Sequence, residues 1–347
     1  MKVSFIVIAY NEQDTLKILF HDIVNQDYNH DLIEVILVDG MSTDNTKKVM
    51  NEFSQEDNGF MRVVVKDNPK KTLPCGWNIA LSESKGEIII RVDAHSSIPT
   101  DFISKNVKCI KGGERICGGY RPNIIDEETP WKKTLLLAET SMFGSSIAPY
   151  RRNSERRYVK SVFHGAYSKE VFEKVGFYNE LLTRTEDNEM HYRMRKAGYN
   201  ICFDPNIISY QHTRNSFKKM LKQKYLNGYW IGATLSECTK CFSFYHFVPF
   251  LFFMAVIFTT LLSLLGNSSL SLLLWSIYFA VNIIISSITI LKNKFSYTNL
   301  VLPFLFVMLH LCYGYGTLVG ILKTFGVVYK RKHKLKKQKG EYYVESH

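Results

Sequence analysis

The stretch EIIIRVDAHSS, residues 87–97, is a short run of β-forming residues that ends in polar side chains. Its isoleucines and Val92 are typical of a buried strand. Asp93 and His95 follow at the tip of that strand, where a hairpin turn would carry Asn-Gly or Asp-Gly. The stretch therefore predicts a buried strand that presents two possible ligands at its carboxyl end.

The sequence before this stretch alternates between strand and helix patterns. Three further apolar runs are expected to be strands: VSFIVIAY (3–10), LIEVILVDG (32–40) and MRVVVKD (61–67). Helical spacing of apolar residues follows the first run, STDNT (42–46) supplies residues that begin a second helix, and LPCGWNIALSES (73–84) predicts a third. This alternation predicts a doubly wound α/β fold.

Polar residues follow three of these strands. Asn11 and Glu12 come after the first strand, Asp39 ends the second, and Asp93 with His95 ends the fourth. Ligands of such sheets bind beyond the carboxyl ends of the strands, so we expect one shared site there. Neither the dinucleotide fingerprint GxGxxG nor a P-loop is present in the sequence, so a bound diphosphate would need a metal ion rather than a glycine cradle.

A second group of acids opens the segment RTEDNEMHYRMRKAGY, residues 184–199. Thr185 is a good N-cap, and Glu186, Asp187 and Glu189 fill the first turn of the predicted helix. One reading is that these acids only complement the helix dipole. The other is that Asp187 is a general base, which the N-terminus of the helix would keep ionised.

The last third of the chain has the composition of a membrane segment. Residues 243–322 contain no Asp or Glu, and basic clusters flank this region. Spans are expected at 245–265 and 270–291. Segment 300–322 is either a plain third span, with Gly316 and Gly320 packed on a neighbouring helix, or a bent, re-entrant segment, since a plain span would place the basic tail outside.

The chain is expected to divide into a cytosolic α/β domain (1–215), an amphipathic interfacial helix (216–242), a transmembrane region (243–325) and a basic tail (326–347). The net charge of +12 is read as attraction to anionic lipid and not to nucleic acid, because no nucleic-acid-binding motif accompanies it. The start of the chain lacks the pattern of a signal peptide. The seven scattered cysteines, including Cys238 and Cys241, are expected to be free thiols.

The motifs IVIAYNE, VILVDGMSTDNT, RVDAHS and RTEDNEMHYRMRKAGY together resemble family 2 inverting glycosyltransferases with a GT-A fold. The DAH form and the apolar C-terminal region resemble the membrane-anchored branch that includes succinoglycan-type exopolysaccharide glucosyltransferases. The resemblance implies a GT-A, Rossmann-like mixed sheet flanked by helices and followed by a C-terminal helical membrane region.

The resemblance also implies roles for individual residues. Asp187 would be the catalytic base, and Glu186 would position it or touch the acceptor. The nucleotide-sugar pocket would contain Ala9, Asn11, Glu12, Asp39, Lys71, Asn78 and Asp93. Trp77 stands where the family has an Arg. Asp93, His95 and His212 would hold a divalent metal, with Mn²⁺ favoured over Mg²⁺ because an imidazole replaces a carboxylate.

The implied function is metal-dependent, inverting transfer from a nucleotide sugar, expected to be UDP-linked, to a polyprenyl-diphosphate-linked saccharide in bacterial exo- or capsular polysaccharide synthesis. The enzyme would be a multi-pass protein of the cell membrane with its catalytic domain on the cytoplasmic face. The alternatives are a polyprenyl-phosphate monosaccharide synthase, a processive polysaccharide synthase, and a non-catalytic scaffold that binds nucleotide sugar.

Overall fold

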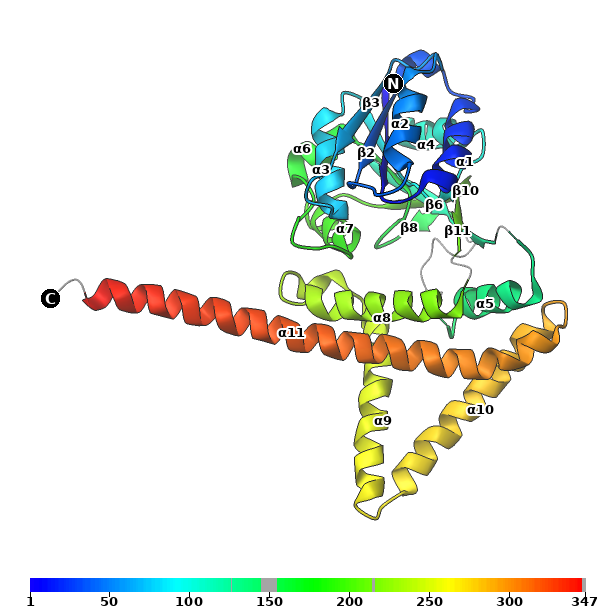
Figure 1. Cartoon of the computed structure of the whole chain (residues 1–347), viewed down its shortest axis with the longest axis vertical. Helices are drawn as coiled ribbons and strands as arrows, with labels where there is room; N and C mark the ends of the chain where they lie inside the picture. The colour runs from blue at the N-terminus through cyan, green and yellow to red at the C-terminus, as the bar shows by residue number, and fades with distance from the viewer. Residues whose placement is uncertain (126, 145–154, 214–215, 345–347) are drawn as a thin grey trace. The chain divides into compact units, whose positions relative to one another are not determined.

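The computed structural model describes residues 1–125, 127–144, 155–213 and 216–344, with side chains described as far as residue 326. The chain forms two compact units (Figure 1). Unit 1 comprises Met1–Glu127 and Ser146–Thr213, and unit 2 comprises Glu128–Ser145 and Arg214–His347. The division between the units falls near residue 213, and the segment from Glu128 to Ser145 belongs to unit 2.

Unit 1 is built on an eight-stranded mixed sheet in the order β3-β2-β1-β4-β9-β6-β10-β8. Strands β3, β2, β1 and β4 are mutually parallel, β10 is parallel to β6, and β9 is antiparallel to both of its neighbours. The strands are β1 (Val3–Ala9), β2 (Ile33–Asp39), β3 (Arg62–Asp67), β4 (Ile88–Asp93), β6 (Ile116–Tyr120), β8 (Arg157–Tyr158), β9 (Gly165–Ser168) and β10 (Cys202–Ile208). The predicted mixed sheet is confirmed.

A second, three-stranded sheet lies within unit 1, in the order β5-β11-β7. It joins β5 (Ser96–Ser97), directly after the Asp93 strand, to β11 (Tyr210–His212) and β7 (Asn123–Ile124). The backbone N–H of His212 donates to the carbonyl oxygen of His95 at 3.2 Å. This small sheet therefore brings residues near 95 and 212 together across more than one hundred positions of sequence.

Helices cover both faces of the large sheet, because alternate residues of β1 point to opposite sides. Phe5 and Val7 belong to one buried cluster with α1 (Gln13–Val24), α2 (Thr46–Gln55) and α4 (Phe102–Lys111). Ile6 and Ile8 belong to the other, with α3 (Leu73–Glu83), α6 (Lys169–Val175) and α7 (Glu186–Lys196). The short helix η1 (His30–Leu32) precedes β2.

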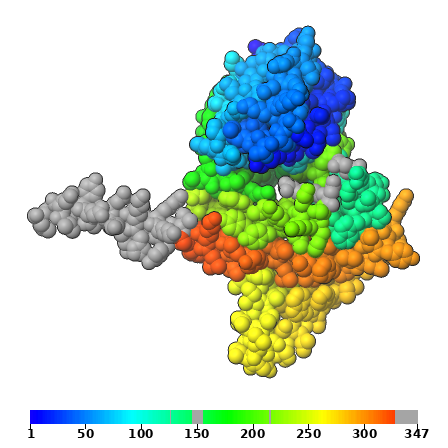
Figure 2. Space-filling view, in the orientation of Figure 1, coloured from blue at the N-terminus to red at the C-terminus, as the bar shows by residue number. Residues whose placement is uncertain are grey.

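Unit 2 is helical. Its elements are α5 (Pro130–Thr140), α8 (Phe217–Thr234), η3 (Thr239–Cys241), η4 (Phe244–Phe247), α9 (Val248–Leu264), α10 (Ser269–Leu291), η5 (Tyr297–Val301) and α11 (Leu302–Val344). In the described part, three segments are long and apolar enough to cross a membrane: Phe244–Leu264, Ser269–Leu291 and Tyr297–Gly326. The hairpin of α9 and α10, yellow in Figure 2, carries exposed Leu and Phe side chains such as Leu251, Phe258 and Leu261.

Helix α5 belongs to unit 2 although it precedes the second segment of unit 1 in the sequence. Its residues Leu135 and Ala138 are buried in a cluster with Leu302, Leu305 and Phe306 of α11. The Thr134 hydroxyl donates to Asn299 Oδ1 at 2.7 Å. An amphipathic helix can pack on any matching apolar surface, and its sequence does not say which one.

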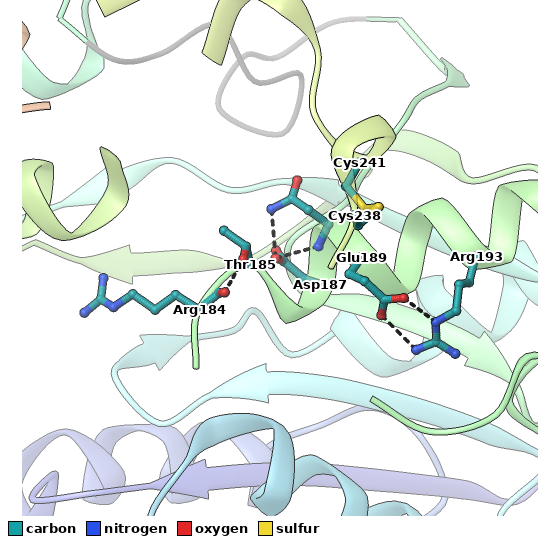
Figure 3. The surroundings of a disulfide bond; sticks show 8 residues. Arg184, Thr185, Asp187, Glu189, Arg193, Cys238 and Cys241 are labelled. Carbon is teal, nitrogen blue, oxygen red and sulfur yellow. Dashed lines mark hydrogen bonds and ion pairs between the residues drawn. A yellow bond between two sulfur atoms is a disulfide. The ribbon is translucent and has the colours of Figure 1, made fainter. Parts of the chain in front are cut away.

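The expectation of free thiols is wrong for one pair. Cys238 and Cys241 form a disulfide, shown in Figure 3. The short helix η3 brings their Cα atoms to 5.6 Å, which lies within the range that a disulfide requires. The other five cysteines are free.

Candidate active site

The carboxyl ends of β2, β1 and β4 meet at one edge of the sheet. Strand β1 lies between the other two, with Ala9 opposite Asp39 and Ile8 opposite Asp93. The two carboxylates therefore lie at the ends of the two strands that flank β1. This edge is where a doubly wound sheet binds its ligands.

The loops after β1 and β2 are held together by hydrogen bonds. The Asn11 side-chain oxygen accepts from the N–H of Thr43 at 2.8 Å, and the N–H of Glu12 donates to Thr46 Oγ1 at 2.8 Å. The buried carboxylate of Asp39 accepts from the N–H of Ser42 at 3.1 and 3.2 Å. These bonds fix the shape of the edge at which Asn11, Glu12 and Asp39 were expected to line a nucleotide pocket.

Left-handed backbone conformations mark the loops at this edge. In the described part of the chain, the non-glycine residues with positive φ are Asn11 (55°), Met41 (63°), Lys71 (58°) and Thr185 (71°). The first three lie in the loops after β1, β2 and β3, and the fourth is the N-cap of α7. Such conformations cost about 1–3 kcal/mol each and cluster at functional sites. Met41 and Thr185 are therefore additional candidates that the sequence did not reveal.

Asn78 has a structural role that differs from the expected nucleotide contact. Its side-chain oxygen accepts from the N–H of Tyr178 at 2.8 Å, and its amide nitrogen donates to the Tyr178 carbonyl oxygen at 2.9 Å. The amide thus clamps the segment before α7, and the contact of Asn78 with the nucleotide sugar stays a prediction. Lys71 is exposed, and Lys70 pairs with Glu180.

His95 is held between two side chains. Gln211 Nε2 donates to His95 Nε2 at 2.8 Å, so that ring nitrogen is the acceptor. The other ring nitrogen, Nδ1, lies 3.6 Å from Glu12 Oε1. His212 Nε2 lies 3.3 Å from Ser97 Oγ. The small sheet therefore places both histidines beside each other but gives each imidazole a protein partner.

The expected ligand set of Asp93, His95 and His212 is not assembled. Among the residues that the structure describes, no group of three or more His, Cys, Asp or Glu side chains is placed to hold a metal ion. Asp93 itself suits a divalent cation, because its ionised form is favoured. Burial would raise the pKa of Asp93, but interactions with His164 and Arg91 hold it below its usual value. A hard cation held here would take its remaining oxygen ligands from a diphosphate.

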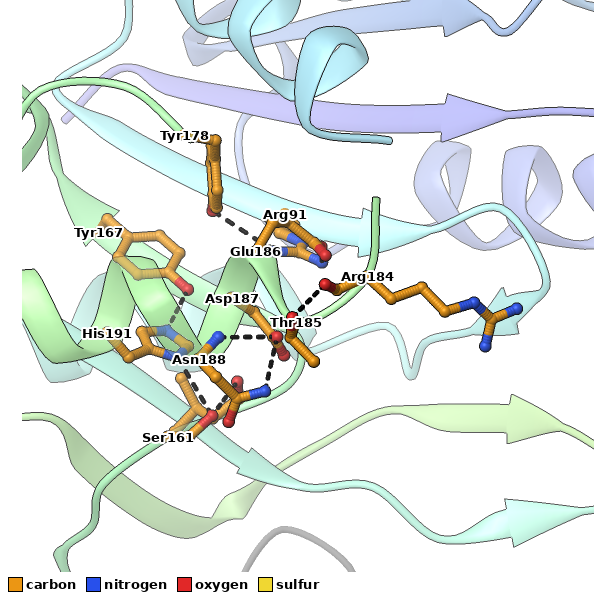
Figure 4. Close-up of polar contacts among 11 residues, drawn as sticks. Arg91, Ser161, Tyr167, Tyr178, Arg184, Thr185, Glu186, Asp187, Asn188 and His191 are labelled. Atoms are coloured by element: carbon orange, nitrogen blue, oxygen red, sulfur yellow. Dashed lines mark hydrogen bonds and ion pairs between the residues drawn. The ribbon is translucent and has the colours of Figure 1, made fainter. Parts of the chain in front are cut away.

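The start of α7 contains a buried ion pair (Figure 4). Glu186 and Arg91 are 3% and 5% exposed, and Arg91 Nη2 donates to Glu186 Oε1 at 3.0 Å. The Arg91 guanidinium also lies 4.3 Å from the centre of the Trp77 ring. Arg91 comes from β4, two residues before Asp93, so this pair ties the start of α7 to the strand that carries Asp93. Arg91 could have been noticed in the sequence, because it is a charged residue inside an otherwise apolar strand.

Asp187 follows Glu186 and is held by its neighbour. Its Oδ1 accepts from the backbone N–H of Asn188 at 2.8 Å and from the side-chain amide of Asn188 at 3.0 Å. Burial raises the pKa of Asp187, while the charge of Arg91 lowers it. Burial likewise raises the pKa of Glu186 to about 7, opposed by Arg91. A carboxylate with a raised pKa is a stronger proton acceptor, which suits a general base.

Two further contacts hold α7 in place and distinguish the roles of its acids. Tyr167 of β9 bonds to His191 Nε2 at 2.9 Å, and burial lowers the pKa of His191 to about 3, so this ring is neutral. Glu189 is paired with Arg193 at 2.7 and 3.0 Å (Figure 3), so it serves the helix. Asp187 and Glu186 are the acids of this turn that share the Arg91 surroundings.

The mixed sheet, with acids at the carboxyl ends of adjacent strands and a further acidic pair at a helix start, has a GT-A-like fold. Residues 4–176 match the family described as Glycosyl transferase family 2. The N-terminal unit of this chain belongs to that family, and the protein is a glycosyltransferase.

Two curated relatives are similar to this chain over different shares of its length. A dolichyl N-acetyl-α-D-glucosaminyl phosphate 3-β-D-2,3-diacetamido-2,3-dideoxy-β-D-glucuronosyltransferase of Methanococcus voltae is 26% identical over 92% of this chain and 97% of its own length. The succinoglycan biosynthesis protein ExoA of Rhizobium meliloti is 29% identical over 48% of this chain and 50% of its own.

A solved structure shows the same fold. The mannosyltransferase PcManGT from Pyrobaculum calidifontis, in complex with GDP-Man and Mn²⁺, is similar with a TM-score of 0.60. The similarity covers 91% of this chain and 87% of that chain at 15% identity. The expected GT-A fold is thereby confirmed.

Proposed function

We propose that this protein transfers a sugar from a nucleotide sugar, with UDP as the expected carrier, to a polyprenyl-diphosphate-linked saccharide, with inversion at the anomeric carbon. Asp187 takes the proton from the acceptor hydroxyl as that oxygen attacks the anomeric carbon. The single observation that carries this proposal is the buried Arg91–Glu186 pair, which fixes Asp187 beside the strand of Asp93. Transfer needs a proton acceptor, which a nucleotide-binding scaffold does not, and buried acids with a raised pKa are frequent at catalytic sites.

The acceptor class is supported by the full-length relative from Methanococcus voltae, whose name describes transfer to a sugar that is already linked to a dolichyl phosphate. We propose the same kind of acceptor here, a lipid-linked saccharide, in exo- or capsular polysaccharide synthesis. The catalytic unit would lie at the cytoplasmic face of the cell membrane, since nucleotide sugars are cytosolic substrates.

The acceptor proposal is tested with the purified full chain in membranes, one nucleotide sugar at a time. Three acceptors are compared: a polyprenyl-diphosphate-linked saccharide, the bare polyprenyl phosphate, and a free oligosaccharide. We expect product from the first. Product from bare polyprenyl phosphate alone would identify a monosaccharide synthase, and products of many added sugars would identify a processive synthase.

A divalent cation is proposed as the cofactor, held by Asp93. When bound, it would neutralise charge on the leaving nucleoside diphosphate. The chain's own residues then position the reactants: the loop bonds of Asn11 and Asp39 shape the nucleotide side, and α7 presents Asp187. His95 would join the ion only if its ring left Gln211, and nitrogen ligands suit first-row transition ions better than Mg²⁺.

We therefore expect higher activity with Mn²⁺ than with Mg²⁺ at equal concentration, and His95→Asp should shift that preference toward Mg²⁺. Metal titrations of both proteins check this. A matched Gln211→Leu variant, which removes the partner of His95 Nε2, should not abolish the Mn²⁺ preference. Identical metal profiles in wild type and His95→Asp would show that His95 does not coordinate the ion.

A further inference from the structure

Helices α8 and α11 pack along each other without intervening side chains. A Cβ atom added at Gly316 would overlap the carbonyl oxygen of Tyr225, and one added at Gly320 would overlap that of Tyr229. Both pairs step by four residues in the same direction along each chain, so the two helices run parallel. Small residues at such spacing allow backbones to approach closely, as expected for Gly316 and Gly320.

The contact is reciprocal and long. A Cβ added at Gly228 of α8 would overlap the carbonyl oxygen of Tyr313, and one at Gly232 would overlap that of Thr317. Towards the start of both helices, the buried Met220 joins a cluster with apolar residues of α11. The pairing thus extends over most of α8, which spans 18 residues.

Helix α8 is unsuited to cross a bilayer. Lys218, Lys219 and Lys222 are exposed in its first half. After Lys224, only 10 residues remain before the helix ends at Thr234, which amounts to about 15 Å against a hydrocarbon core of about 30 Å. Because α11 lies beside α8 over this length and parallel to it, the two helices share the same depth and direction.

Helix α11 also contacts the membrane hairpin. A Cβ added at Gly314 would overlap Phe253 near the start of α9, and the Asn282 amide of α10 donates to the carbonyl oxygen of Pro303 at 2.9 Å. In Figure 1, α9 and α10 leave α11 on the side opposite to α8. Between Leu302 and Gly326, apolar side chains of α11 remain exposed, among them Phe304, Leu322 and Phe325.

The continuous length of α11 bears on how this helix lies relative to a membrane. It runs for 43 residues from Leu302 to Val344, or about 65 Å, which is twice the thickness of the hydrocarbon core. The bent or re-entrant alternative is therefore not observed in the described backbone. A plain span would also place the basic segment 329–340 on the far side of the membrane, against the positive-inside rule.

We infer that α8 and α11 form a two-helix layer that lies along the membrane surface, and that the hairpin of α9 and α10 is the part that crosses the bilayer. The layer binds an anionic lipid surface through the α8 lysines and buries the exposed apolar side chains of α11 among the acyl chains. Because the hairpin crosses twice, the C-terminal tail stays on the side on which α8 begins.

The test uses the full chain in intact bacterial cells and an impermeant maleimide. Single cysteines are added at Asp57 in the catalytic unit, at Asn267 between α9 and α10, and at Gln338 in the tail, and the parent chain gives the background. We expect Asn267→Cys to react in intact cells, and Asp57→Cys and Gln338→Cys to react only after permeabilisation. Reaction of Gln338→Cys together with Asn267→Cys, or of all three positions alike, overturns the inference.

A second measurement addresses the helix pairing itself. Gly316→Leu, made in the Gln338→Cys chain, should force α11 away from α8 and lower the melting temperature of the protein in detergent. Gly326→Leu, on the same helix, meets no atom within 4 Å and should leave the melting temperature unchanged. Equal melting temperatures for the two leucine variants would show that the close approach of α8 and α11 is absent, which also overturns the inference.

Discussion

Replacing Asp187 by Asn is expected to lower the rate of sugar transfer at least ~10²-fold while donor affinity and folding are retained. Asn has the same size, and its side-chain oxygen still accepts from the N–H of Asn188, so the start of α7 keeps its shape. What is lost is the group that takes the acceptor proton. The measurement is kcat and donor KM for wild type and Asp187→Asn, with the same lipid-linked acceptor.

Glu189→Gln is the matched control, because Glu189 lies in the same first turn and is paired with Arg193. We expect this variant to transfer sugar at nearly the wild-type rate. Equal losses in the two variants would mean that Asp187 acts only as a helix-start charge.

The pH dependence of the wild-type enzyme offers an independent check of the same base. Asp187 must be ionised to accept a proton, so kcat/KM should fall as the pH falls through its pKa. Since burial raises that pKa, the fall in kcat/KM should occur at a higher pH than it would for an ordinary Asp. Glu186 and Asp187 interact, so the pKa obtained from the pH profile belongs to the pair.

Replacing Arg91 by Met is expected to destabilise the catalytic unit by about 3–5 kcal/mol, because Glu186 then stays buried without its partner. The full chain in detergent should melt roughly 6–20 °C lower. The pKa of Glu186 is raised to about 7 in the folded state, so the folded protein holds its proton more tightly than the unfolded chain does. The loss should therefore be smaller below pH 7, where Glu186 is neutral, and larger above it.

Two variants make this result specific to the buried pair. Arg91→Met combined with Glu186→Gln removes the uncompensated charge and should recover part of the lost stability. Arg115→Met breaks the exposed ion pair with Glu170 and should cost no more than about 1 kcal/mol. If Arg91→Met lowers the melting temperature by no more than Arg115→Met does, the role assigned to the buried pair is contradicted.

The sheet and the position of the acids were predictable because they follow from local pattern. Continuous apolar runs such as residues 3–10 are typical of buried parallel strands, and parallel strands must deliver their following residues to one edge. Asp39 and Asp93 therefore lie where the order of strands requires. The two long apolar helices of the hairpin were predictable for the same reason, since length and apolar composition suffice to identify candidate spans.

The partners of side chains were not predictable, because they depend on residues far away in sequence. Asn78 was assigned to the nucleotide by motif, yet its amide fits the backbone of Tyr178. His95 was assigned to a metal ion, yet β11 places Gln211 on its ring nitrogen. Helix α11 has the composition of a span, and only its glycine contacts show that it packs parallel to α8.

The anomeric configuration of the product distinguishes inversion from retention of configuration. The full chain is incubated with an α-linked nucleotide sugar and a lipid-linked saccharide, and the new linkage is assigned from the anomeric proton coupling by NMR. A single displacement assisted by Asp187 predicts a β-linkage. An α-linkage would show retention of configuration and would contradict the mechanism.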